Sequence, residues 1–219
     1  MKKRVGILPA SGRAARIAGI PKFCLPVAPD LTLIEWHVNQ MLEICDEVRV
    51  STRSIWIPLL KEMKIDATLI EIEPSTMSDA VYRMANANEE LIIGMPDTYI
   101  NGCHSNIYRQ LIEIEADIVL GIWDCAEYLK GKVGQVLMDK KNQRIIRSMD
   151  KSSECDYPFM WGIVKFNLDK ELLDRKLSSP GLQFQSLIDN NYLIKGQYIQ
   201  GKYFDLGNFD VLKEFYSNL

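Results

Sequence analysis

The sequence predicts an α/β fold, in which a mixed, mostly parallel sheet is covered by helices on both faces. Short apolar runs alternate with segments of helical apolar spacing from the N-terminus to Trp123, an order typical of parallel strands joined by crossover helices. The chain has 219 residues, of which 47% are hydrophobic, and it contains no internal repeat or linker. We therefore expect one domain over residues 1–219.

The strands of the first half are expected as short buried runs. They cover Val5–Leu8, Val48–Ser51, Ala67–Ile72, Glu90–Met95 and Asp117–Trp123. Helices are expected between them, from Thr32 to about Cys45 and over Ile55–Met63, Ser78–Ala87 and Ser105–Glu113. Thr32 and Glu35 form a capping box, and Ser78 is suited to cap the helix that it begins.

The alternation breaks after Trp123. Val133–Met138 and Arg144–Ser148 flank a turn at residues 140–142 and predict an antiparallel pair of strands. The remaining elements are expected to be strands over 158–166 and 192–203 and helices over 168–176, 182–189 and from Asn208 onwards. The second half is therefore an elaboration of the same domain.

Composition excludes several classes of protein. A net charge of -3 gives no reason to bind nucleic acid or a membrane surface. No apolar run approaches the roughly 18 residues of a membrane span, and the apolar stretch after Lys2–Arg4 is too short for a signal peptide. The five cysteines are widely spaced and never form a Cys-x-x-Cys pair, so we expect reduced thiols in a cytoplasmic protein.

The distribution of charge is uneven. Residues 1–29 contain basic side chains and no acidic one, because the first carboxylate is Asp30. A solvated terminus explains Lys2–Arg4. Arg13, Arg16 and Lys22 lie instead in a loop of small residues, and they indicate a site for an anion.

That loop follows the first strand and reads Pro9-Ala10-Ser11-Gly12-Arg13-Ala14-Ala15-Arg16-Ile17. Small residues let backbone N–H groups approach a phosphate chain closely. The nucleotide-binding residues expected here are Ala10, Ser11, Gly12 and Arg13. The glycines do not fit a P-loop or the Gly-x-Gly-x-x-Gly fingerprint, and a plain strand-to-helix connection is the alternative.

The loop and the segment after it resemble the opening of the sugar-phosphate nucleotidyltransferases (sugar-nucleotide pyrophosphorylases). Gly12 matches the first glycine of the family's Gly-x-Gly-Thr-Arg loop, Arg16 its arginine, and Pro21-Lys22 its Pro-Lys. Further similarities follow in the family's order. They are Leu25-Pro26-Val27, Leu33-Ile34-Glu35-Trp36, Pro74 to Ala80, Gly94 to Asp97, Met149-Asp150-Lys151, Trp161-Gly162-Ile163 and Phe204 to Asn208.

The resemblance implies a reaction in which a sugar 1-phosphate, or a similar phosphorylated small molecule, attacks the α-phosphorus of a nucleoside triphosphate and pyrophosphate leaves. Such catalysis is mostly positioning and neutralisation of charge. Two carboxylates and phosphate oxygens suit Mg²⁺. We expect the metal at Asp97, which ends a buried strand, and at Asp205, beside Gly207. Taken alone, each aspartate is more typical of a turn.

The resemblance also implies roles for single residues. Those expected to act in catalysis are Arg16 and Lys22 on the nucleotide phosphates, Asp97 on the metal and Lys151 on the sugar phosphate. Asp150 and the backbone of Gly162 would hold sugar hydroxyls, and Glu73 and Ser78 would lie near the base. A solvated charge pair is the alternative at Asp150-Lys151, and plain helix capping is the alternative at Ser78.

The sequence departs from the family at several of these motifs. Ala14 and Ala15 replace the second glycine and the Thr or Ser, Asp150 replaces a glutamate, and Ser152 stands where a proline is usual. Ala14, Ala15 and Ser152 favour the competing hypothesis of a non-catalytic nucleotide or sugar-nucleotide binding protein. The enzyme is favoured by the residues that are retained, which are Arg16, Lys22, Asp97, Lys151 and Asp205. The base and the acceptor stay open, with polyol phosphates and phosphocholine among the acceptors, and we expect a monomer or dimer.

Other conspicuous residues have simpler explanations. His37 and His104 have no second ligand at metal-binding spacing. Phe159 and Trp161 could line a sugar or base pocket, but aromatic residues in a strand more often belong to the core.

Overall fold

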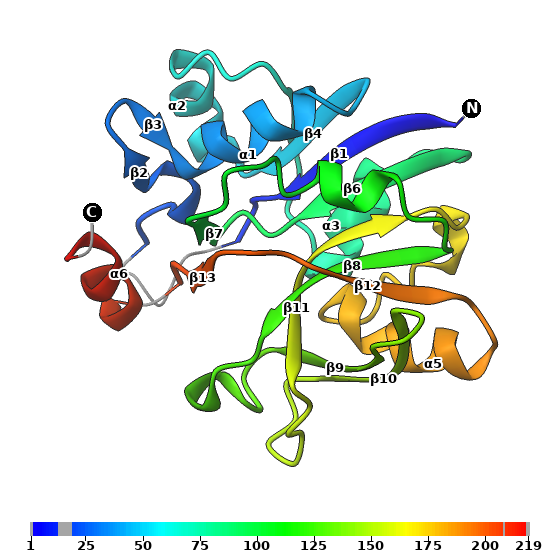
Figure 1. Ribbon diagram of the computed structural model, residues 1–219. Coiled ribbons are helices and arrows are strands. Elements are labelled where there is room, and N and C mark those ends of the chain that lie inside the picture. The colour runs from blue at the N-terminus through cyan, green and yellow to red at the C-terminus, as the bar shows by residue number, and fades with distance from the viewer. Residues whose placement is uncertain (1, 13–18, 208, 218–219) are drawn as a thin grey trace.

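The computed structural model describes residues 2–12, 19–207 and 209–217. Its framework is a mixed nine-stranded sheet with the strand order β5-β4-β1-β6-β11-β8-β12-β10-β9 (Figure 1). These strands are β1 (Lys3–Pro9), β4 (Glu47–Thr52), β5 (Thr68–Glu71), β6 (Glu89–Gly94), β8 (Ile118–Asp124), β9 (Gly134–Asp139), β10 (Arg144–Asp150), β11 (Phe159–Phe166) and β12 (Ile194–Tyr198).

The first half of the sheet is parallel, as expected: β1 pairs with β4 and β6, and β4 pairs with β5. The expectation of a mostly parallel sheet is nevertheless wrong. β11 is antiparallel to β6, β8 and β9, and β10 is antiparallel to β9 and β12, which leaves β8 and β12 as the parallel pair of the second half. A short turn returns the chain directly from β9 to β10, whereas a parallel neighbour needs a long crossover.

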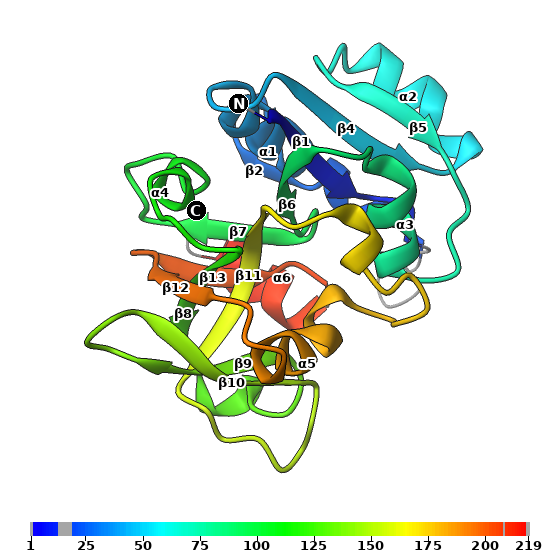
Figure 2. The same cartoon turned by 90° about the vertical axis from the view of Figure 1, so that its right-hand side faces the viewer.

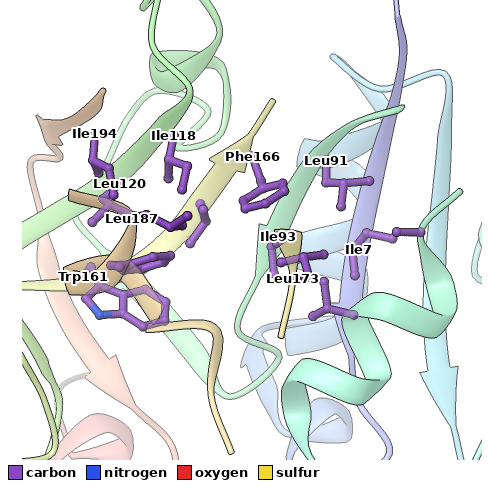
Figure 3. Close-up of a cluster of buried hydrophobic side chains, with 14 of the residues drawn as sticks. Ile7, Leu91, Ile93, Ile118, Leu120, Trp161, Phe166, Leu173, Leu187 and Ile194 are labelled. Atoms are coloured by element: carbon purple, nitrogen blue, oxygen red, sulfur yellow. The ribbon is translucent and has the colours of Figure 1, made fainter. Parts of the chain in front are cut away.

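Helices pack on the sheet through two buried clusters. Leu91 and Ile93 of β6 belong to one cluster, which includes residues of α3 (Met77–Met84) and α5 (Phe184–Asp189); Figure 3 shows part of it. Ile92, between them, belongs to the other, with residues of α1 (Leu33–Leu42), α2 (Ile57–Glu62) and α4 (Arg109–Ile112). Because successive strand side chains point to opposite faces, these helix groups lie on opposite faces of the sheet.

Two small sheets were not expected from the sequence. β7 (Thr98–Asn101) pairs antiparallel with β13 (Lys202–Asp205), and β2 (Pro26–Ala28) pairs with β3 (Leu31–Thr32). The last helix, α6 (Phe209–Tyr216), follows β13. In Figure 1, β13 and α6 lie on the other side of β11 from the β9–β10 hairpin and α5, whereas in Figure 2, turned by 90°, α6 and α5 overlap.

The helix boundaries confirm some expectations and correct others. Thr32 and Glu35 form the capping box of α1. Thr76 rather than Ser78 caps α3, because its hydroxyl accepts a hydrogen bond from the Asp79 N–H at 2.9 Å. The helix expected over 105–113 is reduced to α4, since the Asn106 side chain caps the backbone N–H groups of residues 108 and 109.

The segment expected to be helical over 168–176 holds a single 3-10 turn, Lys170–Leu172. Its side chains bond to α3 instead. Lys170 Nζ donates to the Ala85 carbonyl at 3.0 Å, and Arg175 pairs with Asp79 at 2.6 Å. The segment thus joins the second half of the chain to the helix beside β1.

Within the described ranges, no helix combines the length and the apolar character that crossing a membrane would require.

Candidate functional site

Lys22 is held at the start of a short 3-10 turn, Lys22–Cys24. Pro21 before it has a fixed φ of -66°, and Phe23 after it is buried, so the backbone on both sides of Lys22 is anchored. The Lys22 Nζ lies 2.7 Å from Asp97 Oδ2, and these side chains are 16% and 30% exposed. The sequence expected both residues in the site, and the structure brings them together.

Asp205 joins this pair through the small β7–β13 sheet. Thr98 is the register partner of Asp205, and the Leu206 N–H donates to the Asp97 carbonyl at 2.8 Å. A Cβ added at Gly207 would lie 2.5 Å from Asp205 Oδ1 and 2.8 Å from Lys22 Nζ. We call Lys22, Asp97 and Asp205 the carboxylate cluster; it closes around the space that Gly207 leaves open.

Tyr203 lies next to the carboxylate cluster and contacts its β7 strand. Its buried hydroxyl shares a 3.0 Å hydrogen bond with Thr98 Oγ1, next to Asp97. Burial and the charges of Asp205 and Asp97 raise the pKa of Tyr203 far above its ordinary value, so the phenol stays neutral.

The Tyr203 ring also covers Gly162, where an added Cβ would lie 2.8 Å from the ring. The structure therefore places Gly162 under an aromatic ring, where its missing side chain makes room for Tyr203.

A cleft opens at the carboxyl ends of β1, β4 and β5. Its volume is ≈ 550 Å³. Gly12 lines it together with the polar residues Ser11, Arg53, Glu73, Ser75 and Thr76. Arg53 and Glu73 form an ion pair at 3.2 Å, in which the Glu73 side chain is 67% exposed. We call this the base-side cleft, because the sequence expected Glu73 beside a nucleobase.

The residues expected in the phosphate loop have different environments. The Ala10 N–H is engaged with the Ser51 carbonyl at 3.1 Å, and Ser11 accepts a hydrogen bond from Ser51 at 3.3 Å. A Cβ at Gly12 would meet no described atom within 4 Å, so the backbone there is open to a ligand. Arg13 and Arg16 lie outside the described residues.

The residues that line the base-side cleft differ from the prediction at two positions. Ser78 is buried inside α3 and does not line it. Arg53 lines it and was missed by the sequence analysis, although it follows the strand beside β1, where parallel strands bring their carboxyl ends to one edge.

A second group of polar atoms lies where β10 and β11 meet the 3-10 turn Pro180–Gln183. A Cβ at Gly181 would lie 3.0 Å from Asp150 Oδ2 and would overlap the Trp161 ring. Asp150 Oδ2 and the Trp161 indole Nε1 are buried and have no hydrogen-bond partner among the residues that the structure describes. We call Asp150, Trp161 and Gly181 the hairpin site.

Lys151 follows Asp150 in a left-handed conformation, with φ of 54°, uncommon for residues other than glycine. Its N–H donates to the Val133 carbonyl at 3.2 Å, and its side chain is exposed. In the described part of the chain, no hydrogen bond or ion pair joins Asp150 or Lys151 to the carboxylate cluster. The structure therefore presents the expected site residues as two groups.

His37 is a buried structural residue. Its Nδ1 lies 2.5 Å from the Tyr108 hydroxyl, and burial lowers its pKa to about 4. His37 is consequently neutral near pH 7. Among the described residues, no group of three or more His, Cys, Asp or Glu side chains could hold a metal.

A cation at the carboxylate cluster would have two protein carboxylates, and phosphate oxygens and water would complete its ligands. Hard oxygen donors with few protein ligands fit Mg²⁺.

Comparison by sequence finds no matching protein-family model and no matching curated protein. Comparison of structures finds close matches in shape. A UDP-glucose pyrophosphorylase solved with UDP-glucose has a TM-score of 0.80 and 16% identity, and the match covers 100% of both chains. The chain has the fold of the sugar-phosphate nucleotidyltransferases.

Two further structures share this nucleotidyltransferase fold. The inositol-1-phosphate CTP transferase from T. maritima has a TM-score of 0.73 at 15% identity, covering 99% of this chain and 96% of the other. A UTP-bound UGPase from Acinetobacter baumannii has a TM-score of 0.73 at 15% identity, covering 100% and 93%. At these identities the likeness concerns the fold, which the resemblance of the sequence motifs had implied.

Proposed function

We propose that this chain is a cytoplasmic nucleotidyltransferase whose catalytic domain spans residues 1–219. It transfers a nucleoside monophosphate from a nucleoside triphosphate to a phosphorylated small molecule that bears hydroxyl groups, such as a sugar 1-phosphate. The observation that carries the proposal is the carboxylate cluster, in which Lys22 and Asp97 lie 2.7 Å apart and Asp205 closes on the same space. In phosphoryl transfer, an ammonium group neutralises phosphate charge, and two carboxylates can hold a divalent cation that does the same.

The nucleoside and the phosphates of the nucleotide would bind to different residues around the loop that follows β1. The base-side cleft, with Ser11 and Gly12 at its mouth, would take the nucleoside, and Arg13, Arg16 and Lys22 would bind the phosphates. Asp97 and Asp205 would hold Mg²⁺, which supplies charge neutralisation at the α-phosphate when it is bound. Arg16 would stabilise the leaving pyrophosphate through charge-assisted hydrogen bonds.

The hairpin site supports an acceptor with hydroxyl groups. A buried carboxylate oxygen of Asp150 faces Gly181, and the buried indole N–H of Trp161 faces Gly134, the register partner of Asp150, so an acceptor and a donor lie near the same end of the hairpin. A hydroxyl group can donate to the first and accept from the second. Lys151, next to Asp150, would bind the phosphate of the acceptor.

The second candidate is a non-catalytic binding protein, which Ala14, Ala15 and Ser152 favour. Pyrophosphate release separates the two. The full chain with Mg²⁺ is assayed against each nucleoside triphosphate in the presence of hexose 1-phosphates, inositol 1-phosphate and phosphocholine.

We expect release with at least one sugar or polyol phosphate. Nucleotide binding by calorimetry without pyrophosphate release across the panel would establish the binding protein instead.

A further inference from the structure

We infer that the Lys22 ammonium occupies the place of the divalent cation in the free protein and exchanges that place for the nucleotide phosphates when metal and nucleotide arrive together. This inference rests on the proposed metal site at Asp97 and Asp205. It gives Lys22 a second, positioning role besides its contact with phosphate. The consequence is that the free protein binds a bare divalent ion poorly.

The geometry at Gly207 places the Lys22 ammonium close to both carboxylates. The Lys22 Nζ is 2.7 Å from Asp97 Oδ2. The same Nζ and Asp205 Oδ1 both approach the Cβ position of Gly207, at 2.8 Å and 2.5 Å. A divalent ion shared by the two aspartates would have to enter this region, which the ammonium now fills.

The backbone fixes this arrangement. The Leu206 N–H bond to the Asp97 carbonyl, 2.8 Å long, ties the two aspartate segments together. The Lys22 side chain is only 16% exposed, so solvent screens its charge incompletely. A metal ion arriving without nucleotide meets two negative charges and one positive charge at short range.

Nucleotide changes this balance. A triphosphate brings several negative charges, to which a flexible lysine side chain can move as a point charge. The carboxylates are then freed for the metal ion that the triphosphate carries. The exchange explains why an ammonium lies at a site whose expected ligand is a cation.

The test measures binding of Mn²⁺ alone, followed through the loss of its free-ion electron paramagnetic resonance signal, to the full chain without nucleotide. Lys22→Gln removes the charge and Lys22→Arg keeps it. Lys3→Gln is the matched control, because Lys3 makes an ion pair of equal length, 2.7 Å, with Glu47 at the opposite end of β1. Circular dichroism verifies that each variant is folded.

We expect Lys22→Gln to bind Mn²⁺ at least roughly tenfold more tightly than the wild type, because a neighbouring positive charge has been removed. Lys22→Arg and Lys3→Gln should stay within about twofold of the wild type, since the local charge at the cluster is unchanged. Adding Asp97→Asn to Lys22→Gln should abolish the gain. A Lys22→Gln protein that binds Mn²⁺ as weakly as the wild type, or more weakly, overturns the inference.

The outcome is independent of turnover. If the panel of acceptors yields no pyrophosphate but Lys22→Gln gains affinity, the exchange stands and the proposed reaction fails. If the wild type releases pyrophosphate and Lys22→Gln gains nothing, the reaction stands and the exchange fails.

Discussion

The carboxylate cluster and the base-side cleft differ from the hairpin site in how their polar groups are satisfied. On the parallel half of the sheet, the charged groups are already paired, as Lys22 with Asp97 and Arg53 with Glu73. On the antiparallel half, Asp150 Oδ2 and Trp161 Nε1 are buried without a partner in the described part of the chain. One region holds ion pairs that a ligand must exchange, and the other holds hydrogen-bonding groups that a ligand could complete.

This difference has an energetic consequence. A partly exposed ion pair contributes little to stability, so separating it costs little when the phosphates of a nucleotide take the place of the carboxylate as the partner of the positive charge. A buried polar atom without a partner destabilises the free protein by about 1–3 kcal/mol, and a ligand that bonds to it recovers that free energy. We therefore expect substitutions in the first region to act on turnover and salt dependence, and those in the second to act on acceptor affinity.

The largest effect is expected at the carboxylate cluster. Asp97→Asn and Asp205→Asn each keep the shape of the side chain but remove a charge from the metal, so the rate of pyrophosphate release should fall at least roughly a hundredfold. Asp46→Asn is the control, because Asp46 Oδ2 accepts from the Arg4 N–H at 2.8 Å at the opposite edge of the sheet. Undiminished turnover in Asp97→Asn would end the assignment of the metal to this cluster.

The carboxylate cluster could be predicted from the sequence only in part, because local sequence patterns do not determine long-range strand pairing. Periodicity located β1, β4 and β6, and motif resemblance named Lys22, Asp97 and Asp205. The β7–β13 pairing that places Asp97 beside Asp205 joins segments about a hundred residues apart, and register over that distance depends on tertiary packing rather than on local alternation. For the same reason, the sequence did not predict that the Tyr203 ring packs over Gly162.

The second half was harder to predict for a related reason. The antiparallel hairpin was found because its turn is short. The insertion of β11 between β6 and β8 has no local signal, since a strand buried on both faces is equally apolar in either direction. Local capping was also misread at Ser78, where the competing hydroxyl of Thr76 lies at the geometry that α3 requires.

An intermediate effect is expected at Asp150 in the hairpin site. Asp150→Asn replaces one carboxylate oxygen by an amide, so a charged hydrogen bond to an acceptor hydroxyl is lost and the KM for the acceptor should rise roughly tenfold to a hundredfold. The KM for the nucleotide should stay within about twofold, since the pairs of the other region are untouched.

Asp139→Asn, in the partner strand of the same hairpin, provides the comparison. Asp139 Oδ1 accepts from the Lys141 N–H at 2.9 Å in the turn, and Asp139 pairs with Arg144 at the opposite end of the hairpin from the Asp150–Gly134 pair. Equal effects of Asp139→Asn and Asp150→Asn on the acceptor KM would show that the hairpin acts only as a scaffold.

A smaller effect is expected for Trp161→Phe, which removes the indole N–H and keeps an aromatic ring in the core. The acceptor KM should rise about fivefold to tenfold, the equivalent of one neutral hydrogen bond. Trp123 also has a buried Nε1 without a hydrogen-bond partner among the described residues, but it packs in the opposite cluster, against Tyr203. Trp123→Phe should therefore leave the acceptor KM unchanged, and identical responses of the two variants would remove Trp161 from the hairpin site.

The smallest effect is expected at the Arg53–Glu73 pair, which is the clearest test of the exchange of ion pairs. The pair is 3.2 Å long and its carboxylate is 67% exposed, so its contribution to stability is close to zero. Glu73→Gln should leave the denaturant midpoint unchanged and free Arg53 for the nucleotide, while Arg53→Gln should raise the nucleotide KM about threefold to fivefold, with a weaker dependence on salt. Steady-state kinetics at about 0.05 M and 0.5 M salt, which differ in screening length, measure both changes. If Arg53→Gln lowers the denaturant midpoint instead of raising the nucleotide KM, Arg53 stabilises the fold, and the distinction between the two regions does not extend to the base-side cleft.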